Sequence, residues 1–272
     1  MNIVYSGDDG YQDALLISAL SLCKHNPDRP IHLYFLTGDF PEINSSFISL
    51  KEGSARRIVS YCQKYNPHVS YDIIDCTKIY NQYLSHNANK KSRYSVYAML
   101  RLFLDQLSGI PDRILYLDGD MVVMKPIDEL YDTELGDHDI GMVQDAVGYK
   151  YFGRHYCNSG VLLADIARLR KDRNFEKALD YMAHHHLFMP DQTSINRTMK
   201  NSILMLDKKY NEQKATDEET VIRHYCKVFH LFPYIHVSDY KPWRCDEFEK
   251  KFKDENRDIA EKYRKIKAEE KK

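Results

Sequence analysis

Short apolar runs alternate with helix-like segments along the first two thirds of the chain, and this alternation constrains the fold more than any other feature. We expect strands over residues 2–6, 31–36, 69–74, 113–124, 140–143 and 159–163. We expect helices over residues 14–23, 54–65, 96–107 and 165–173. An order of this kind predicts an α/β sheet with helices on both faces. In such folds, ligands bind outside the carboxyl ends of the strands.

Two pairs of acidic residues fall at expected strand ends. Asp8 and Asp9 follow the first strand, and Asp118 and Asp120 flank Gly119 in the stretch "ILYLDGDMVVM". Burying an unpaired carboxylate costs several kcal/mol, and a second one nearby adds to that cost. The second pair has apolar residues on both sides. It therefore requires a cation, a proton or a ligand.

Three interpretations of Asp118 and Asp120 stay open on these residues alone. The first is a solvated turn at the tip of a strand, which the apolar flanks disfavour. The second is a clamp for Mg²⁺ or Mn²⁺, because hard divalent cations take carboxylate oxygens and are shared with substrate phosphates. The third is a haloacid-dehalogenase-like, Mg²⁺-dependent phosphatase with Asp118 as nucleophile. Its Asp-x-Asp pattern normally lies on the first strand, whereas at least three strand–helix units come first here.

Composition excludes several other classes of protein. With 43% hydrophobic and 29% charged residues among 272, the chain is typical of globular domains. Its net charge of -1 gives no reason to expect a nucleic-acid partner. No apolar run approaches the ~18 residues needed to cross a bilayer, and the N-terminus does not resemble a signal peptide. Six scattered cysteines predict reduced thiols, and so a cytoplasmic protein.

The C-terminal segment differs from the rest in composition. We expect one catalytic domain over residues 1–245 and a charged helical tail over residues 246–272, with residues 265–272 frayed into solvent. Basic and acidic residues are interleaved in this tail, so we expect at most weak peripheral membrane contact. The inner face of the membrane is the alternative to a free cytoplasmic location.

Six segments, in order, resemble glycosyltransferase family 8, and in particular the bacterial lipopolysaccharide α-galactosyl- and α-glucosyltransferases. The segments are "NIVYSGDDGYQDALLISALSL", "YAMLRLFLDQL" with "DRILYLDGDMVVMKPIDELYD", "MVQDAVG", "YCNSGVLLADIARLRK", "PDQTSIN" and "HYCKVFHLFPYIHVSDYKPW". Most are weak singly, but their common order makes a chance resemblance hard to sustain. The resemblance implies the GT-A fold of nucleotide-diphospho-sugar transferases, with a mixed, mostly parallel sheet flanked by helices.

The resemblance also implies a site for a nucleotide-sugar donor. Its residues would be Asp8, Asp9, Tyr11, Arg101, Asp118, Gly119, Asp120, Asn158, Ser159 and Lys241. The acids after the first strand would accept hydrogen bonds from uracil or ribose, or else cap the following helix, and Tyr11 would stack on the base. Arg101 would pair with the donor diphosphate, or hold Asp118 and Asp145 in place.

Three residues are implied on the sugar side of the donor. Asp145 would bond to sugar hydroxyls, while Asp191 and Gln192 would lie at the face of the anomeric carbon. An amide is a poor nucleophile, so we assign Gln192 and Asp191 to positioning and electrostatic support. Lys241 would neutralise the leaving diphosphate, and Trp243 would pack beneath the closing loop or simply anchor the core.

The metal needs a third protein ligand, and two histidines compete for that role. His224 keeps the local His-Tyr-Cys resemblance but lies 17 residues before Lys241, whereas His236 lies five residues before it, near the family spacing. We favour His224 and treat residues 227–240 as an insertion. A neutral imidazole with two carboxylates suits Mn²⁺ better than Mg²⁺.

These features predict an enzyme: a Mn²⁺-dependent, retaining hexosyltransferase. It would move glucose or galactose from a UDP-sugar to a saccharide acceptor, such as a cell-surface glycan or a lipopolysaccharide or glycoprotein precursor. The alternatives are the phosphatase described above, a self-glucosylating primer protein, and a sugar-nucleotide binder without activity.

Overall fold

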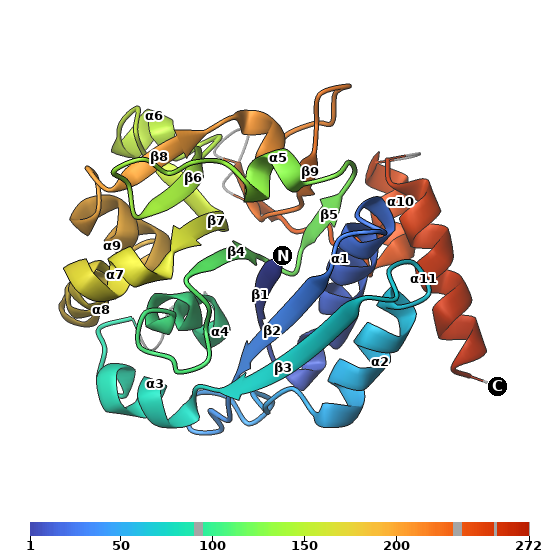
Figure 1. Cartoon of the computed structure of the whole chain (residues 1–272), viewed down its shortest axis with the longest axis horizontal. Helices are drawn as coiled ribbons and strands as arrows, with labels where there is room; N and C mark the ends of the chain where they lie inside the picture. The colour runs from blue at the N-terminus through green and yellow to red at the C-terminus, as the bar shows by residue number, and fades with distance from the viewer. Residues whose placement is uncertain (90–94, 231–235, 253–254, 272) are drawn as a thin grey trace.

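A seven-stranded mixed sheet forms the centre of the molecule. The structure is a computed structural model, and it describes residues 1–89, 95–230, 236–252 and 255–271 (Figure 1). The strands of the sheet are β1 (Asn2–Ser6), β2 (Ile31–Thr37), β3 (Val69–Asp75), β4 (Arg113–Leu117), β6 (Ile140–Gln144), β7 (Cys157–Asp165) and β8 (Ile203–Leu206). Their order is β3-β2-β1-β4-β7-β6-β8.

Most pairs of neighbouring strands in this sheet are parallel. β3, β2, β1 and β4 run parallel, β8 runs parallel to β6, and β7 is antiparallel to both of its neighbours. The prediction of a mixed, mostly parallel sheet is therefore confirmed. The strands expected over residues 2–6, 31–36, 69–74, 140–143 and 159–163 are all present, as β1, β2, β3, β6 and β7.

Helices cover both faces of the sheet. α1 (Gln12–His25) and α2 (Glu52–Cys62) pack on one face, where Ile3 and Tyr5 of β1 point. The opposite face of β1 carries Val4, which shares a core with α3 (Thr77–Leu84), α4 (Val96–Met99), α7 (Ile166–Asp172), α8 (Asn174–His184) and α9 (Pro190–Thr198). Successive side chains of a strand alternate in direction, so β1 is buried on both faces.

The long strand predicted over residues 113–124 is wrong, because the chain bends in its middle. β4 ends at Leu117, and β5 (Met121–Val123) leaves the sheet to pair with β9 (Ile222–His224). The bend at Gly119 packs closely against Tyr11: a Cβ added to Gly119 would lie 2.6 Å from Tyr11 Cε1. Glycine thus lets the chain turn there, between the two acids.

The long helix predicted over residues 96–107 is also wrong. α4 is a single turn, followed by a 3₁₀ turn over Leu100–Phe103. Leu100, Leu102 and Phe103 are all buried, so packing on several sides overrides helix propensity. This tight turn directs Arg101 inward, where its Nε donates to Ala98 O at 2.7 Å.

The C-terminal segment forms two helices that pack against the domain. α10 (Cys245–Phe252) and α11 (Arg257–Glu269) contribute Phe248 and Tyr263 to the same core as α1, and Figure 1 shows α11 running along the outside of α1 and α2. The Tyr263 hydroxyl donates to Asp13 Oδ2 at 2.8 Å. The predicted fraying is wrong as far as Glu269, because the apolar face of α11 is buried.

The remaining elements are short. They are α5 (Asp128–Tyr131), α6 (Tyr149–Phe152), the 3₁₀ turns Asp9–Tyr11 and Lys208–Tyr210, and the two-stranded pair β10 (Val228–His230) with β11 (His236–Ser238). Among the helices that the structure describes, none is both long and apolar enough to span a membrane.

Candidate active site

A cleft of about 1220 Å³ lies where β1 and β4 end, as expected for the carboxyl edge of an α/β sheet. Almost every residue implicated by the sequence lines it: Asp8, Tyr11, Arg101, Asp118, Gly119, Asp120, Asp145, Asn158, Ser159, Asp191, Gln192, His224, Lys241 and Trp243. Segments from all parts of the chain thus meet at one place. Among the implicated residues whose side chains the structure describes, only Asp9 does not line the cleft.

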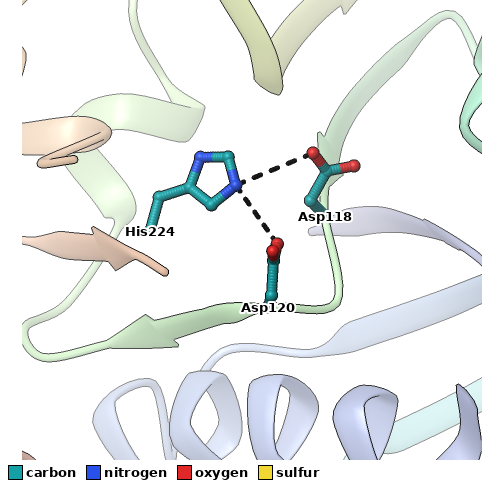
Figure 2. A group of neighbouring side chains, drawn as sticks. All are labelled: Asp118, Asp120 and His224. Carbon is teal, nitrogen blue, oxygen red and sulfur yellow. Dashed lines mark ion pairs between the residues drawn. The ribbon is translucent and has the colours of Figure 1, made fainter. Parts of the chain in front are cut away.

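Asp118, Asp120 and His224 converge at the floor of this cleft, with their ligand atoms within 4.8 Å of one another. His224 Nε2 lies 3.1 Å from Asp120 Oδ1 and 3.9 Å from Asp118 Oδ2 (Figure 2). The pairing of β5 with β9 places His224 opposite Met121, one residue after Asp120. The register of two short strands therefore creates the cluster.

His236, the other histidine considered as a metal ligand, lies on a different pair of strands from His224. His236 begins β11, where its backbone pairs with His230. Its side chain lies outside the part of the structure that is described. The geometry thus places His224 against both carboxylates, and the choice of His224 as the third ligand stays a prediction.

Gly160 leaves the room that the cluster needs. A Cβ added to Gly160 would lie 2.6 Å from His224 Cε1 and 2.8 Å from Asp118 Oδ2. Because atoms do not approach so closely, any other residue would displace one of these groups. The glycine of the "NSG" segment thus allows the imidazole and the carboxylate to face one another.

Lys241 compensates the charge of Asp120. Its Nζ lies 2.6 Å from Asp120 Oδ2, 2.7 Å from Tyr225 O and 3.1 Å from Asp239 Oδ1. Burial by itself would raise the pKa of Asp120, but the Lys241 ammonium outweighs it and holds that pKa well below the usual range. Burial would likewise lower the pKa of Lys241, and Asp120 raises it instead. Both groups are therefore charged.

Arg101 is fully enclosed and holds two carboxylates. Its Nη2 lies 2.8 Å from Asp118 Oδ1 and its Nε 3.3 Å from Asp191 Oδ2, while Nη1 donates to Ser159 O. The guanidinium also stacks 4.3 Å from the centre of the Tyr116 ring. We expected Arg101 to hold Asp118 and Asp145. Asp118 is indeed beside it, but the second carboxylate is that of Asp191 and not that of Asp145. Burial raises the pKa of Asp191, and Arg101 opposes that rise.

The sugar-side residues form a separate network of hydrogen bonds. Asp145 Oδ2 accepts from Asn158 Nδ2 at 3.1 Å and from Gln192 Nε2 at 3.0 Å. Asp145 Oδ1 accepts from the backbone of Val147 and Gly148 at 3.0 and 2.6 Å. Gln192 Oε1 in turn accepts from Asn158 Nδ2 at 3.1 Å. These bonds fix the direction in which each polar group points.

At the other end of the cleft, the residues after β1 divide into two roles. Asp8 lines the cleft, and burial raises its pKa. Asp9 turns away, accepting from Lys51 N and Ser54 Oγ at the start of α2. This geometry favours a structural role for Asp9, whose contact with the donor stays a prediction.

Tyr11 lines the cleft and packs against two of its other residues. Its ring meets Trp243 edge-on, with ring centres 5.4 Å apart at 87°, and packs under Gly119. Trp243 therefore ties the end of the domain to the 3₁₀ turn after β1. Stacking of Tyr11 on a base stays a prediction.

Two residues escaped the sequence reasoning. Asn211 Oδ1 lies 3.0 Å from His224 Nδ1, and Asp239 pairs with Lys241. Asp239 could have been noticed, because it lies two residues before the lysine of the Lys-Pro-Trp segment. Asn211 carried no signal, since a lone buried asparagine has no characteristic spacing.

Comparisons with known proteins agree with this geometry. The sequence profile of the family described as "Glycosyl transferase family 8" matches residues 2–247. The chain belongs to glycosyltransferase family 8. Glycosyltransferase GlyA of Streptococcus pneumoniae serotype 4 is 30% identical over 89% of this chain, and the lipopolysaccharide 1,3-galactosyltransferase of Salmonella typhimurium is 24% identical over 88% of this chain and 76% of its own length.

Solved structures establish the fold. The galactosyltransferase LgtC, crystallised with donor and acceptor sugar analogues, superposes with a TM-score of 0.69 at 19% identity, covering 98% of this chain and 95% of its own. The chain thus has the GT-A fold. It spans 32% of the length of GlyA and 56% of that of a second pneumococcal relative, glycosyltransferase GlyE.

Proposed function

We propose that this chain is a Mn²⁺-dependent, retaining hexosyltransferase that uses UDP-glucose or UDP-galactose and a saccharide acceptor. The observation that carries the proposal is the convergence of Asp118, Asp120 and His224 in the cleft of a family 8 domain. The phosphatase alternative loses its support, because the family and the fold both belong to glycosyltransferases.

The residues of the cluster fit a divalent cation. Two carboxylate oxygens and an imidazole nitrogen form a mixed set of the kind that suits Mn²⁺, with Mg²⁺ as the alternative. Asp118, Asp120 and His224 would hold the ion, and Gly160 leaves the space between them open. When bound, such an ion stabilises the negative charge that develops on a leaving diphosphate.

The lysine beside the cluster would support the same step. The Lys241 ammonium is buried, charged and already fixed at the edge of the candidate metal site. A fixed cation where charge develops stabilises the transition state without reorganising at the moment of reaction. We infer that Lys241 neutralises the UDP leaving group, with Asp120 and Asp239 holding it in place.

The sugar side supports retention by front-face attack. Asp191 is engaged by Arg101 and Ser159, and Asp145 accepts hydrogen bonds at both oxygens. Neither carboxylate has the freedom expected of a nucleophile, and Gln192 is an amide. These groups therefore position the donor sugar and support the charge at its anomeric carbon, while the acceptor attacks from the side on which UDP leaves.

The outer part of the cleft supports a saccharide acceptor. Four large apolar side chains line it while remaining exposed: Val147, Tyr151, Phe152 and Phe188, at 39%, 62%, 42% and 49%. Exposed aromatic rings beside polar groups bind ligands that are apolar on one side and polar on the other, as sugar rings are. A cell-surface glycan, or a precursor of lipopolysaccharide or glycoprotein, has this chemistry.

Six free cysteines, four of them buried, suit a reducing compartment. We therefore place the reaction in the cytoplasm, with the inner membrane face as the alternative.

A thermal-shift screen tests the donor. UDP-, GDP- and CDP-sugars are compared with and without Mn²⁺, and turnover is followed for every sugar that binds. Preferential stabilisation by a UDP-hexose with Mn²⁺, followed by transfer to an added saccharide, is expected. Equal stabilisation by all three nucleotides, or none, would overturn the proposal. Hexose added to the protein itself would reveal a self-glucosylating primer, and binding without turnover a non-catalytic binder.

A further inference from the structure

A continuous row of buried polar side chains connects the sugar side of the cleft to the candidate metal site. Asp145 accepts from Asn158, Asn158 accepts from Asn211, and Asn211 meets His224. Asn158, Asn211 and His224 are exposed by only 7%, 2% and 3%. Buried polar groups are costly unless each one is satisfied, so the row has one consistent arrangement.

The backbone fixes the direction of the whole row. Gly160 N–H can only donate, and it lies 3.0 Å from Asn158 Oδ1, which identifies that atom as the oxygen. The other amide atom of Asn158, Nδ2, donates to the carboxylate of Asp145. Asn211 Nδ2 must then be the group that donates to Asn158 Oδ1, at 2.9 Å. Asn211 Oδ1 is therefore an acceptor.

This direction determines the tautomer of His224. Because Asn211 Oδ1 can only accept, His224 Nδ1, 3.0 Å away, must carry a proton. In the neutral ring, Nε2 is then an unprotonated lone pair. That lone pair faces Asp120 Oδ1 at 3.1 Å and Asp118 Oδ2 at 3.9 Å. Three electron-pair donors that face one another require a cation or a proton between them.

We propose that Asn211 is the positioning residue of the metal site: it orients the His224 ring, holds its proton on Nδ1, and links the site to the residues on the sugar side. The inference rests on the proposed function for the identity of the cation. Residues that orient a metal-binding histidine through its second nitrogen typically change metal affinity by about 10–100-fold when they are replaced. Without Asn211, the ring can rotate or move its proton to Nε2, where it would repel a cation.

The matched comparison is Asn211→Leu against Asn66→Leu. Asn66, which follows α2 and does not line the cleft, is equally buried: its Nδ2 donates to Asn26 O and Arg29 O in the loop after α1, and its Oδ1 accepts from His68 N. Both changes remove a buried amide and destabilise the fold. Mn²⁺ affinity, measured by electron paramagnetic resonance, is expected to fall about 10–100-fold only in Asn211→Leu. Equal affinities in the two variants would overturn the proposal.

Imidazole ¹⁵N resonances of His224 at alkaline pH provide a readout that needs no metal. The intact chain is expected to show a protonated Nδ1 and an unprotonated Nε2. Asn211→Asp, which keeps an acceptor for Nδ1–H, is expected to retain this pattern even if Asn211→Leu does not fold. A proton on Nε2 in the intact chain would overturn the inference, whereas absence of Mn²⁺ binding with the expected tautomer would overturn only the metal assignment.

The link to the sugar side is tested by Asn158→Ala. In the described part of the chain, the hydrogen bonds of the Asn158 side chain go to Asp145, Gln192, Gly160 and Asn211 rather than to Asp118 or Asp120, and its oxygen orients Asn211. Mn²⁺ affinity is expected to fall in Asn158→Ala, and to fall no further in the double variant Asn158→Ala/Asn211→Ala, because both act through one path. Additive losses would show that Asn211 acts independently of the sugar side.

Discussion

Asp120 and Asp105 are buried to the same degree, but their pKa values are shifted in opposite directions. Their exposed fractions are 9% and 7%. Asp120, in the cleft, faces His224 and is bonded to Lys241, whose ammonium holds the pKa of Asp120 well below the usual range. Asp105, outside the cleft, has one carboxyl oxygen without a hydrogen-bond partner in the described part of the chain, and burial together with Glu176 raises its pKa to about 7.

The difference teaches that burial alone does not decide the charge of an acid in this protein. Removal from water penalises the charged form of both residues, and only the presence of cations reverses the outcome. Two acids in an apolar stretch are tolerable at residues 118 and 120 because Arg101 pairs with Asp118 and Lys241 pairs with Asp120. Carboxylates kept charged inside a cleft are the ones prepared to bind a cation.

The largest expected effect follows from removing the charged acid. Asp120→Ala and Asp118→Asn are expected to lower turnover of UDP-glucose or UDP-galactose in Mn²⁺ by about a hundredfold or more, because each removes a group that acts where charge develops. Asp105→Asn is the control and should retain activity. Near-normal rates in either cleft variant would end the metal-clamp interpretation and the contrast with Asp105.

Replacing each histidine in turn tests which of the two binds the metal ion next to Asp120. His224→Ala is expected to weaken Mn²⁺ binding more than the roughly 10–100-fold typical of residues that only orient a ligand, whereas His236→Ala should leave it unchanged. The measurement is Mn²⁺ titration followed by electron paramagnetic resonance. If Mn²⁺ binding weakened only in His236→Ala, the third metal ligand would be His236 and not His224.

The pH dependence of folding stability tests the raised pKa of Asp105. Folded Asp105 holds a proton up to about pH 7, while the unfolded chain releases it near the ordinary value of 3.8. The folded state thus binds more protons within this window, so Asp105 lowers stability as pH rises from about 4 to 7. Asp105→Asn is expected to remove that decline and to raise the melting temperature at about pH 8 by several degrees, at about 2–4 °C per kcal/mol.

Thermal melts of both proteins across this range measure the effect. An unchanged pH profile in Asp105→Asn would show that the buried acid finds a partner in solution, and the comparison with Asp120 would fail.

The smallest expected effect lies at the outer cleft, where no charge is involved. Tyr151→Ala and Phe188→Ala are expected to raise the KM for the best acceptor among methyl and octyl glucosides and galactosides about fivefold, and to leave hydrolysis of the donor by water unchanged. Tyr83→Ala, an exposed tyrosine outside the cleft, is the control. Equal KM values in all three variants would show that Tyr151 and Phe188 do not contribute to acceptor binding.

Much of the fold could be predicted because its signals are local. The apolar runs identified β1, β2, β3, β6 and β7, and the acids after β1 and β4 indicated which edge of the sheet carries the cleft. The errors also have local causes. Apolar runs on both sides of the acid pair concealed the bend at Gly119, and the buried leucines after α4 looked like one long helix.

The sequence by itself determined the order of the elements, the pair of acids at a strand end and the family resemblance. Only the tertiary structure decided which groups meet those acids. The register of β5 with β9 presents His224, the turn before α10 presents Lys241, and the loop after β8 presents Asn211. Periodicity specifies the element to which a residue belongs, but contacts between distant segments depend on register and packing, which no local pattern encodes.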